Sequence, residues 1–326
     1  MSEVTNKNRV IGVDISLEST SYAIVDVRGN IIARDEFNTQ DYSNVTDYVG
    51  KLSEVIVNLA EQNGGYQTIR SIGISTPSGN YLTGCIENAP NLAWKGVIPM
   101  AALLQDRLGV AVALGNDAHL AGLGEHAFGC AHGMNNFILI TIGHGIGSCV
   151  FSNGKVHLGA DGFAGEIGHT CLMYNGRICG CGKKGCLEAY CGAKGIVLTA
   201  QELMAESNEP TMMRTIDHLT PKNICECCEQ GDKMAIEVFE RTGRLLGRAL
   251  AGYASIIDPE AIVFAGGISH AGHWLLNPAN EEFEKLVFHN TRDKVKFLVS
   301  ALDDHERDVL GASVLAWDIK EYSLFK

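Results

Sequence analysis

Residues 10–37 read VIGVDISLESTSYAIVDVRGNIIARDEF, and this stretch decides the fold. Its first five residues form an apolar run that ends in Asp14, and residues 21–27 and 31–37 are two further runs of strand-forming residues. The turn between those two runs contains Gly29, which tolerates backbone angles that other residues avoid. The stretch therefore predicts three consecutive strands, the first of which places a carboxylate at its end.

The same order of features returns in the second half of the chain. Residues 136–142 predict a strand that enters a glycine-rich turn at 143–147, and a second strand at 148–152 turns at Asn153-Gly154 into a third. Further strands are predicted at 69–75, 110–114 and 261–265, and apolar spacing predicts helices at 45–62, 100–108 and 233–256. This alternation predicts two α/β halves of similar architecture.

The composition limits the possible partners. The chain has 326 residues, 46% of them hydrophobic, which is enough for two ordinary globular domains. Its formal net charge of −12 argues against nucleic acid, because binding to a phosphate backbone depends on lysine and arginine. No run of about 18 apolar residues is present, so we expect no membrane span. The polar N-terminus MSEVTNKNR lacks an apolar signal region, so we expect a cytoplasmic protein.

Glycine-rich turns follow two of the predicted strands, as GHGIG at 143–147 and as Gly266-Gly267. Such turns let backbone N–H groups approach a phosphate, because no side chain stands in the way. Glycines at strand ends also form plain turns. Both turns are therefore candidates for phosphate binding, with a purely structural role as the alternative.

Asn116-Asp117 follows another predicted strand. An aspartate at such a strand end can accept the proton of a hydroxyl that attacks a phosphoryl group. The alternative is that these residues cap the helix predicted at 118–127. The two interpretations are compatible, because a cap position also aims the side chain.

His169, Cys179, Cys181 and Cys186 form a set of one imidazole and three thiols. This set suits tetrahedral zinc, and because protein would fill all four positions, the predicted zinc is structural. The alternative is a reduced thiol cluster without metal. A second cysteine group at 225–228 has no suitable fourth ligand nearby, so we interpret it as helix and loop packing, with metal binding as the alternative.

Together these motifs resemble the ROK family (repressors, open reading frames, sugar kinases) over nearly the whole chain. The resemblance is carried by PNLAW at 90–94, NDA at 116–118, GHGIG at 143–147, GFAGEIGH at 162–169, CGCGKKGCLE at 179–188, DPE at 258–260 before Gly266-Gly267, and GAS at 311–313. It implies an actin-like (ribonuclease H-like) ATPase fold of two α/β domains with an interdomain cleft. We expect the small domain at 1–115 plus a C-terminal helix at about 309–326, and the large, zinc-binding domain at 116–308.

The resemblance also implies an activity, a glucokinase-like transfer of phosphate from ATP to a hexose, in a protein that is a homodimer. In this interpretation Asp117 is the general base, and Asp14 faces Mg²⁺ and the phosphates. The implied sugar contacts are Asn91, Asn116, Glu166, His169 and Glu188. The implied ATP contacts are Gly143, Gly145, Gly266 and Gly267. His169 would bind zinc through one ring nitrogen and sugar through the other.

The chain departs from the family pattern after Asp14, where Gly-Gly-Thr is usual and residues 16–19 read SLES. Leu17 and Glu18 bring bulk and negative charge to a predicted phosphate site. His144 and His119 also replace residues usual in the family. These departures leave a sugar-binding sensor without kinase activity as the alternative function. A repressor is not expected, because only nine residues precede Val10 and the net charge is acidic.

Overall fold

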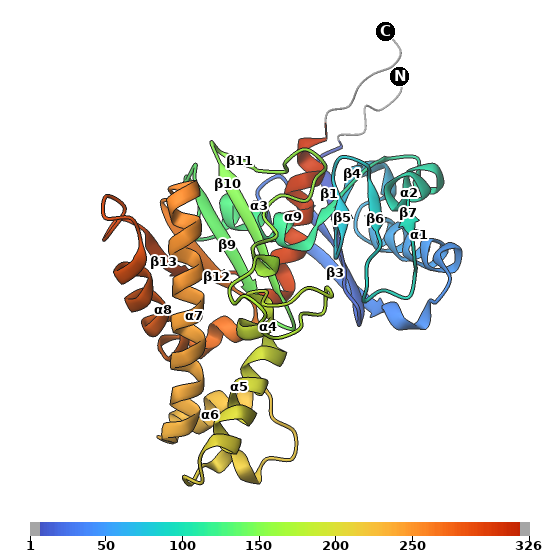
Figure 1. Ribbon diagram of the computed structural model, residues 1–326. Coiled ribbons are helices and arrows are strands. Elements are labelled where there is room, and N and C mark those ends of the chain that lie inside the picture. Colours follow the sequence, from blue (N-terminus) through green and yellow to red (C-terminus); the bar gives the residue numbers. More distant parts are fainter. Residues whose placement is uncertain (1–6, 320–326) are drawn as a thin grey trace, which may run out of the picture. The chain divides into compact units, whose positions relative to one another are not determined.

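The computed structural model describes residues 7–319, which form two compact units (Figure 1). The first unit contains the described residues up to Gly133, residues 158–164 and the described residues from Ala301 on, and the second contains the remainder. The sequence placed the divisions after 115 and after 308. The structure instead groups α3 (Asp117–Phe128) with the first unit, because α3 packs against α9 (Asp304–Asp318).

α9 begins five residues before the C-terminal helix that the sequence predicts at about 309–326. Residues 320–326 of that prediction lie outside the described residues, as do residues 1–6 of the polar N-terminus. Within residues 7–319, no helix is both long enough and apolar enough to cross a membrane.

The main sheet of the first unit has the strand order β3-β2-β1-β4-β8. Its strands are β1 (Arg9–Ile15), β2 (Ser19–Asp26), β3 (Ile31–Asn38), β4 (Ile69–Thr76) and β8 (Ala111–Asn116). β1 pairs antiparallel with β2 and parallel with β4, and β4 pairs parallel with β8. The three consecutive strands predicted from residues 10–37 are confirmed.

The main sheet of the second unit repeats this arrangement with the order β11-β10-β9-β12-β13. Its strands are β9 (Phe137–Ile142), β10 (Ile146–Ser152), β11 (Lys155–Val156), β12 (Ala261–Ala265) and β13 (Lys296–Val299). β9 again pairs antiparallel with the next strand, β10, and parallel with β12. The predicted internal repeat is confirmed at the level of topology.

A small three-stranded sheet in the first unit was not predicted. It consists of β5 (Gly79–Asn80), β6 (Cys85–Glu87) and β7 (Val97–Ile98). Strands of two or three residues carry no readable alternation of apolar and polar residues, so the sequence gives no signal for them.

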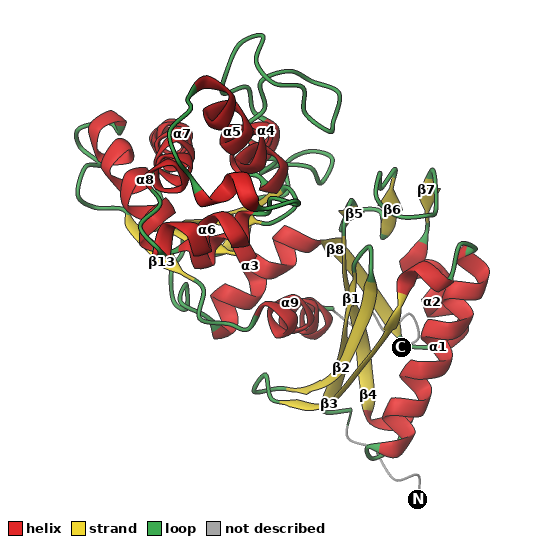
Figure 2. Cartoon of the chain, turned by 90° about the horizontal axis from the view of Figure 1, so that it is seen from below, coloured by secondary structure: helices red, strands yellow, loops and turns green. Residues whose placement is uncertain are grey.

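Helices cover both faces of the first sheet, with α1 (Val45–Gln62) and α2 (Met100–Leu108) on one face and α9 on the other (Figure 2). Because side chains alternate along a strand, Ile11, Val13 and Ile15 pack toward α1. Val10 packs with α9 residues instead. Gly12 and Asp14 alternate with Ile11, Val13 and Ile15 along β1, so they face α9 on the other side of the sheet.

Glycines set how closely α9 approaches its neighbours. Gly12 and Gly73 are paired across β1 and β4, and a Cβ on either would overlap a backbone carbonyl of α9. On the other side of the helix, a Cβ on Gly311 would overlap the carbonyl of Leu120 in α3. α3 is therefore fixed to the sheet through α9, by contacts between backbones.

The second unit has five α-helices among the described residues, and they pack against its sheet and against one another. They are α4 (Glu188–Cys191), α5 (Ala193–Glu206), α6 (Pro221–Glu229), α7 (Lys233–Ile257) and α8 (His273–Leu286). α7 and α8 run side by side (Figure 1), and Gly243 and Gly247 of α7 face the α8 backbone. Short 3₁₀ helices complete both units: η1 (Thr39–Asp41) and η2 (Tyr66–Thr68) in the first, and η3 (Ile167–His169), η4 (Met212–Thr215) and η5 (Gly267–Ala271) in the second.

The close approach of α9 and α3 predicts that Gly311→Ala destabilises the protein. The added methyl group has to push α3 away, which lowers the free energy of unfolding by about 1–3 kcal/mol. Gly50→Ala in α1 is the matched control, because its Cβ would meet only the Arg107 guanidinium, at 3.5 Å. That substitution gains helix propensity and raises stability by about 0.5–1 kcal/mol. Urea unfolding of both variants measures the difference, and equal effects would contradict the packing argument.

Candidate active site

Polar residues gather where the parallel strands of the first sheet end. Asp14 at the end of β1 is paired with Ser75 of β4, and the next residue of β4, Thr76, is paired with Asn116 of β8. The carboxyl ends of parallel strands share one edge of a sheet, which is where ligands bind in open α/β folds. The sheet therefore brings Asp14 and Asn116 to one edge, although about a hundred residues separate them in the chain.

Asp14 lies among other acids on the α9 face of the sheet. Burial raises its pKa, and the carboxylates of Asp308 and Asp117 raise it further, to about 8. Arg307 opposes this shift, but its guanidinium also binds Asp308 at 3.0 Å and Asp304 at 2.5 Å. The first unit therefore holds a crowded set of carboxylates that a cation would relieve. Asp308 could not be predicted as a site residue, because nothing in the local pattern of α9 distinguishes it.

Asn116 and Asp117 occupy the start of α3. The Asn116 side chain is the N-cap and accepts hydrogen bonds from the amides of Ala118 (3.0 Å) and His119 (3.3 Å). Asp117 is the first residue of the helix, and one of its carboxylate oxygens accepts a bond from Ala118 at 2.7 Å. The predicted cap is confirmed for Asn116. The cap and the helix dipole hold the Asp117 carboxylate at a fixed place beside the strand ends.

Asn91 lies on an irregular segment that two apolar residues anchor. Leu92 and Trp94 are buried in the core of the first unit, and the Trp94 indole donates to the carbonyl of Tyr42 at 3.0 Å. Asn91 itself is exposed. The segment thus presents the Asn91 amide on the surface of the first unit with a fixed backbone.

The second unit brings the four predicted zinc ligands together. The ligand atoms of His169, Cys179, Cys181 and Cys186 all lie within 4.8 Å of one another. His169 Nδ1 is 3.7 Å from Cys179 Sγ, and Cys181 Sγ is 3.7 Å from Cys186 Sγ. Zinc–sulfur bonds of about 2.3 Å in a tetrahedron require sulfur atoms about 3.8 Å apart. The donor set therefore fits a zinc ion in both chemistry and spacing.

Glu188 connects this cluster to the glycine-rich turn at 143–147. One carboxylate oxygen lies 3.4 Å from Cys179 Sγ, and the other accepts the amide of Ile146 at 3.0 Å. A Cβ on Gly145 would overlap the Glu188 carboxylate, so a larger residue there would have to displace the end of this side chain from the Ile146 amide. The motif glycine therefore makes room for a side chain, a role that the sequence did not indicate.

Glu166 and His169 frame the short helix η3. Glu166 precedes η3 and is exposed, and its carbonyl accepts the amide of His169 at 3.1 Å. His169 is half-buried, with Nδ1 facing the thiols. Lys183 donates to the His169 carbonyl at 2.9 Å, which ties η3 to the cysteine loop.

A cavity of about 750 Å³ in the second unit contains parts of both predicted phosphate turns. Gly143 and His144 line it from the β9–β10 turn, and Gly267 lines it from η5. The opposite wall is α6, from Thr220 to Glu229. Gly145 and Gly266 are not among the lining residues; Gly266 has φ +83° and a Cβ there would overlap Ile142. α6 was not predicted as a wall, although its start carries a sequence signal, the capping box of Thr220 and Asn223 with Pro221 between them.

The three cysteines at 225–228 belong to α6. Cys227 and Cys228 are buried in the core of the second unit, and Cys225 lines the cavity. Within the described residues they are not part of a metal-ligating group. The packing interpretation is confirmed for Cys227 and Cys228.

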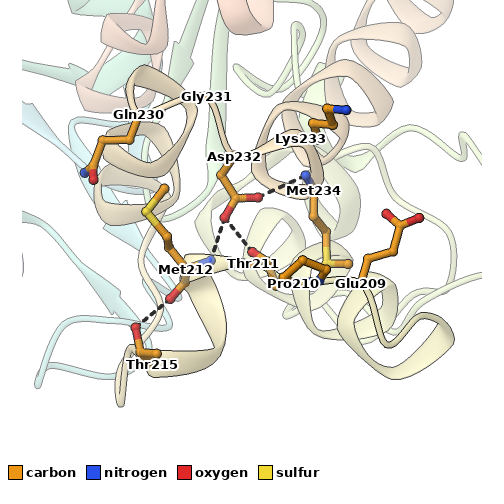
Figure 3. Close-up of a pocket in the computed structure, with 10 residues that line it drawn as sticks. All are labelled: Glu209, Pro210, Thr211, Met212, Thr215, Gln230, Gly231, Asp232, Lys233 and Met234. Atoms are coloured by element: carbon orange, nitrogen blue, oxygen red, sulfur yellow. Dashed lines mark hydrogen bonds between the residues drawn. The ribbon is translucent and has the colours of Figure 1, made fainter.

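A second cavity, of about 820 Å³, holds none of the predicted site residues (Figure 3). Asp232 lies at its centre and uses both oxygens structurally. One caps α7 through the amides of Met234 and Ala235, and the other accepts from Thr211 and Met212, both at 2.7 Å. Burial alone would raise the pKa of Asp232, but these hydrogen bonds lower it. Both Asp232 oxygens in this cavity therefore already bind the protein's own backbone and side chains.

Residues 10–319 match the profile of the ROK family. The chain belongs to the ROK family. It is 32% identical over 323 residues to the glucokinase of Halalkalibacterium halodurans, which covers 95% of this chain and 94% of that protein. It is 26% identical to the DNA-binding transcriptional dual regulator NagC of Escherichia coli, over 95% of this chain and 76% of the regulator.

A solved structure supports the same assignment. The ROK family glucokinase from Streptomyces griseus, in complex with glucose and AMPPNP, is 28% identical and superposes with a TM-score of 0.78. The match covers 95% of this chain and 99% of that one. The predicted actin-like ATPase fold is confirmed, and it accounts for the repeated sheet topology of this ROK protein.

The acidic surroundings of Asp14 predict that Asp14→Asn stabilises the protein, and more so at high pH. The pKa of Asp14 is about 8 in the folded state and 3.8 in the unfolded state. Between about pH 4 and about pH 8, the folded protein therefore keeps a proton on Asp14 that the unfolded protein has lost. The stability of the wild type therefore falls as pH rises from about 4 to about 8. Asparagine removes this loss.

Thermal unfolding at pH 5 and pH 8 measures this effect. We expect the melting temperature of the Asp14→Asn protein to exceed that of the wild type by more at pH 8 than at pH 5. Glu54→Gln, on the exposed face of α1, is the control and should show no such pH-dependent gain. A gain for Asp14→Asn that does not grow with pH would contradict the assignment.

Proposed function

We propose that this ROK protein catalyses ATP-dependent phosphorylation of a glucose-like hexose at a terminal hydroxyl. The observation that carries the proposal is the cavity of about 750 Å³, because turns from two separate strands, at Gly143 and Gly267, open into it. A cavity of this size lined by backbone at glycine turns suits a nucleotide. The glucokinase relatives support the sugar as acceptor.

Asp117 is the proposed general base. It accepts the hydroxyl proton while the sugar oxygen attacks the terminal phosphorus of ATP. Phosphoryl transfer depends mainly on positioning and charge neutralisation, so a carboxylate held by a helix start is well suited to the task. Asn116 supplies that positioning through its cap, and its amide nitrogen is proposed to donate to the sugar.

Asp14 is proposed to face Mg²⁺ and the transferred phosphate. The carboxylates of Asp308 and Asp117 raise its pKa, so a divalent cation would relieve their repulsion. Mg²⁺ supplies charge neutralisation to the phosphates when it is bound with ATP.

The altered turn after Asp14 still offers backbone donors. Ser16 closes it, since its amide donates to the Ser19 carbonyl at 2.9 Å and its hydroxyl accepts the Ser19 amide at 3.2 Å. No residue of this turn has a positive φ, so glycine is not required for its conformation. The amides of Leu17 and Glu18 have no partner among the described residues. These two donors favour a kinase over the sensor.

Asn91 and Asn116 are the sugar contacts proposed in the first unit, and Glu166, His169 and Glu188 are those proposed in the second. Amides, carboxylates and imidazole suit vicinal hydroxyls, which donate and accept hydrogen bonds. Since His169 Nδ1 faces the thiols, Nε2 is the ring nitrogen proposed for the sugar. Gly145 and Gly266 do not line the cavity, and they are proposed to set the backbone course of the two turns that do.

The zinc proposed at His169, Cys179, Cys181 and Cys186 is structural and fixes the His169 ring. Its Lewis acidity has no part in the proposed reaction, because four protein ligands complete its coordination. The proposal further places the protein in the cytoplasm as a homodimer, as the family resemblance implies.

A sugar-binding sensor is the second candidate. It is favoured by the bulk of the Leu17 side chain and the negative charge of the Glu18 side chain in the first turn, and by similarity to a ROK transcriptional regulator. A coupled ADP-release assay with glucose, mannose, fructose, allose and N-acetylated hexoses separates the two candidates. Calorimetric sugar binding without turnover of any of these sugars would establish the sensor and refute the kinase.

Asp117→Asn tests the base. We expect turnover to fall by about a hundred- to ten-thousand-fold, the usual contribution of a general base, with sugar affinity changed only slightly. Steady-state kinetics and calorimetry give the two quantities. Asp106→Asn, on the exposed face of α2, is the control and should keep full activity. Undiminished turnover in the Asp117 variant would exclude the role.

Metal analysis tests the zinc site. The purified chain should hold about one zinc. Cys181→Ser should lose it and unfold several degrees lower, because the serine hydroxyl is a poor zinc ligand. Cys85→Ser in β6 is the matched control, and it should keep both zinc and stability. A metal-free protein of unchanged stability would refute the site.

A further inference from the structure

A fourth thiol lies beside the three thiols and the imidazole of the proposed zinc site. Cys171 is exposed and is not one of the four residues whose ligand atoms converge. It forms an antiparallel bridge with Cys186, which is buried with 1% of its surface exposed. The chain therefore places a free, accessible thiol opposite a buried ligand thiol.

The register of this bridge brings the two cysteines close. The Leu172 amide donates to the Gly185 carbonyl at 2.7 Å, and the Leu187 amide donates to the Thr170 carbonyl at 3.0 Å. These bonds flank Cys171 and Cys186 without joining them, which defines a non-hydrogen-bonded pair. In such pairs the Cα atoms are ~4.5 Å apart and both side chains are on the same face.

This separation is within the range of disulfides, whose Cα atoms are ~4.4–6.8 Å apart. A second observation places the thiol itself near the partner strand. A Cβ built on Gly185, the neighbour of Cys186, would be 3.4 Å from Cys171 Sγ. The two thiols can therefore bond with little movement of the backbone.

We propose that a peroxide converts Cys171 and Cys186 into a reversible disulfide, which removes Cys186 from the zinc set. The inference rests on the proposed zinc site and is independent of the proposed kinase reaction. Disulfides in reducing compartments are usually transient and redox-sensing.

The chemistry proceeds in two steps that balance. The Cys171 sulfur attacks the peroxide, so that a sulfur–oxygen bond forms, the oxygen–oxygen bond breaks and water leaves with the thiol proton. The Cys186 thiolate then attacks the resulting sulfenic acid, and hydroxide leaves as the disulfide forms. Two sulfurs lose two electrons to the peroxide. The accessible Cys171 meets the oxidant first, and the buried Cys186 resolves it.

The loss of Cys186 as a ligand would affect the proposed sugar contacts His169 and Glu188, because both lie next to the cysteine cluster. Cys181 lies 3.7 Å from Cys186, and Cys179 contacts both His169 and Glu188. A cluster with three ligands holds zinc less tightly, and its release would free the His169 ring. Oxidation would therefore loosen the residues that the proposed function assigns to the hexose.

The test uses the zinc-loaded full chain treated with hydrogen peroxide. Zinc release is followed with a chelating dye, and the disulfide is mapped by mass spectrometry after tryptic cleavage without reduction. Arg177 and Lys184 separate the peptide carrying Cys171 from the peptide carrying Cys186. We expect these peptides joined, with a mass lower by two hydrogens, in step with zinc release. Dithiothreitol with added zinc should reverse both.

Cys171→Ser leaves all four proposed ligands in place and should release zinc several-fold more slowly than the wild type. Cys85→Ser, which removes a thiol elsewhere, should release zinc as the wild type does. Equal release from wild type and the Cys171 variant would overturn the proposal. So would a cross-link confined to Cys179, Cys181 and Cys186, or a protein that holds no zinc. Each of these readings is independent of kinase activity.

Discussion

Close contact between backbones at glycine positions is the constraint on which the first unit depends. Gly12 and Gly73 let α9 lie directly on β1 and β4, and Gly311 lets α3 lie directly on α9. A helix held in this way cannot slide or tilt without a clash. The place of Asp117 at the start of α3 is therefore fixed by contacts between main chains, one of them a single helical turn away at Leu120.

The proposed zinc site would supply a comparable constraint in the second unit. The segment between His169 and Cys186 contains little regular structure, and the four proposed ligands converge there. Glu188 connects this cluster to the glycine turn through the Ile146 amide. In the first unit, the crowded carboxylates around Asp14 disfavour its ionised form, which lowers stability at high pH.

Much of the fold was readable because its signals are local. The apolar runs in residues 10–37, the helical spacing at 45–62 and the His/Cys cluster within 169–186 each depend on neighbours in the chain. The family signature extended these signals to a fold that the structural comparison supports. The small sheet of β5, β6 and β7 could not be predicted, because its strands are too short to show an alternation of apolar and polar residues.

The sequence by itself determined the strands and helices with a clear period, the strand-end position of Asp14 and the four residues that converge as the proposed zinc ligands. Only the tertiary structure decided that Asp308 faces Asp14, that α6 closes the nucleotide-sized cavity and that Cys171 pairs with Cys186. The physical reason is the range of the interactions. Periodicity and ligand spacing act within a few residues, whereas a carboxylate's neighbours, a cavity's walls and a bridge's register depend on how distant segments pack.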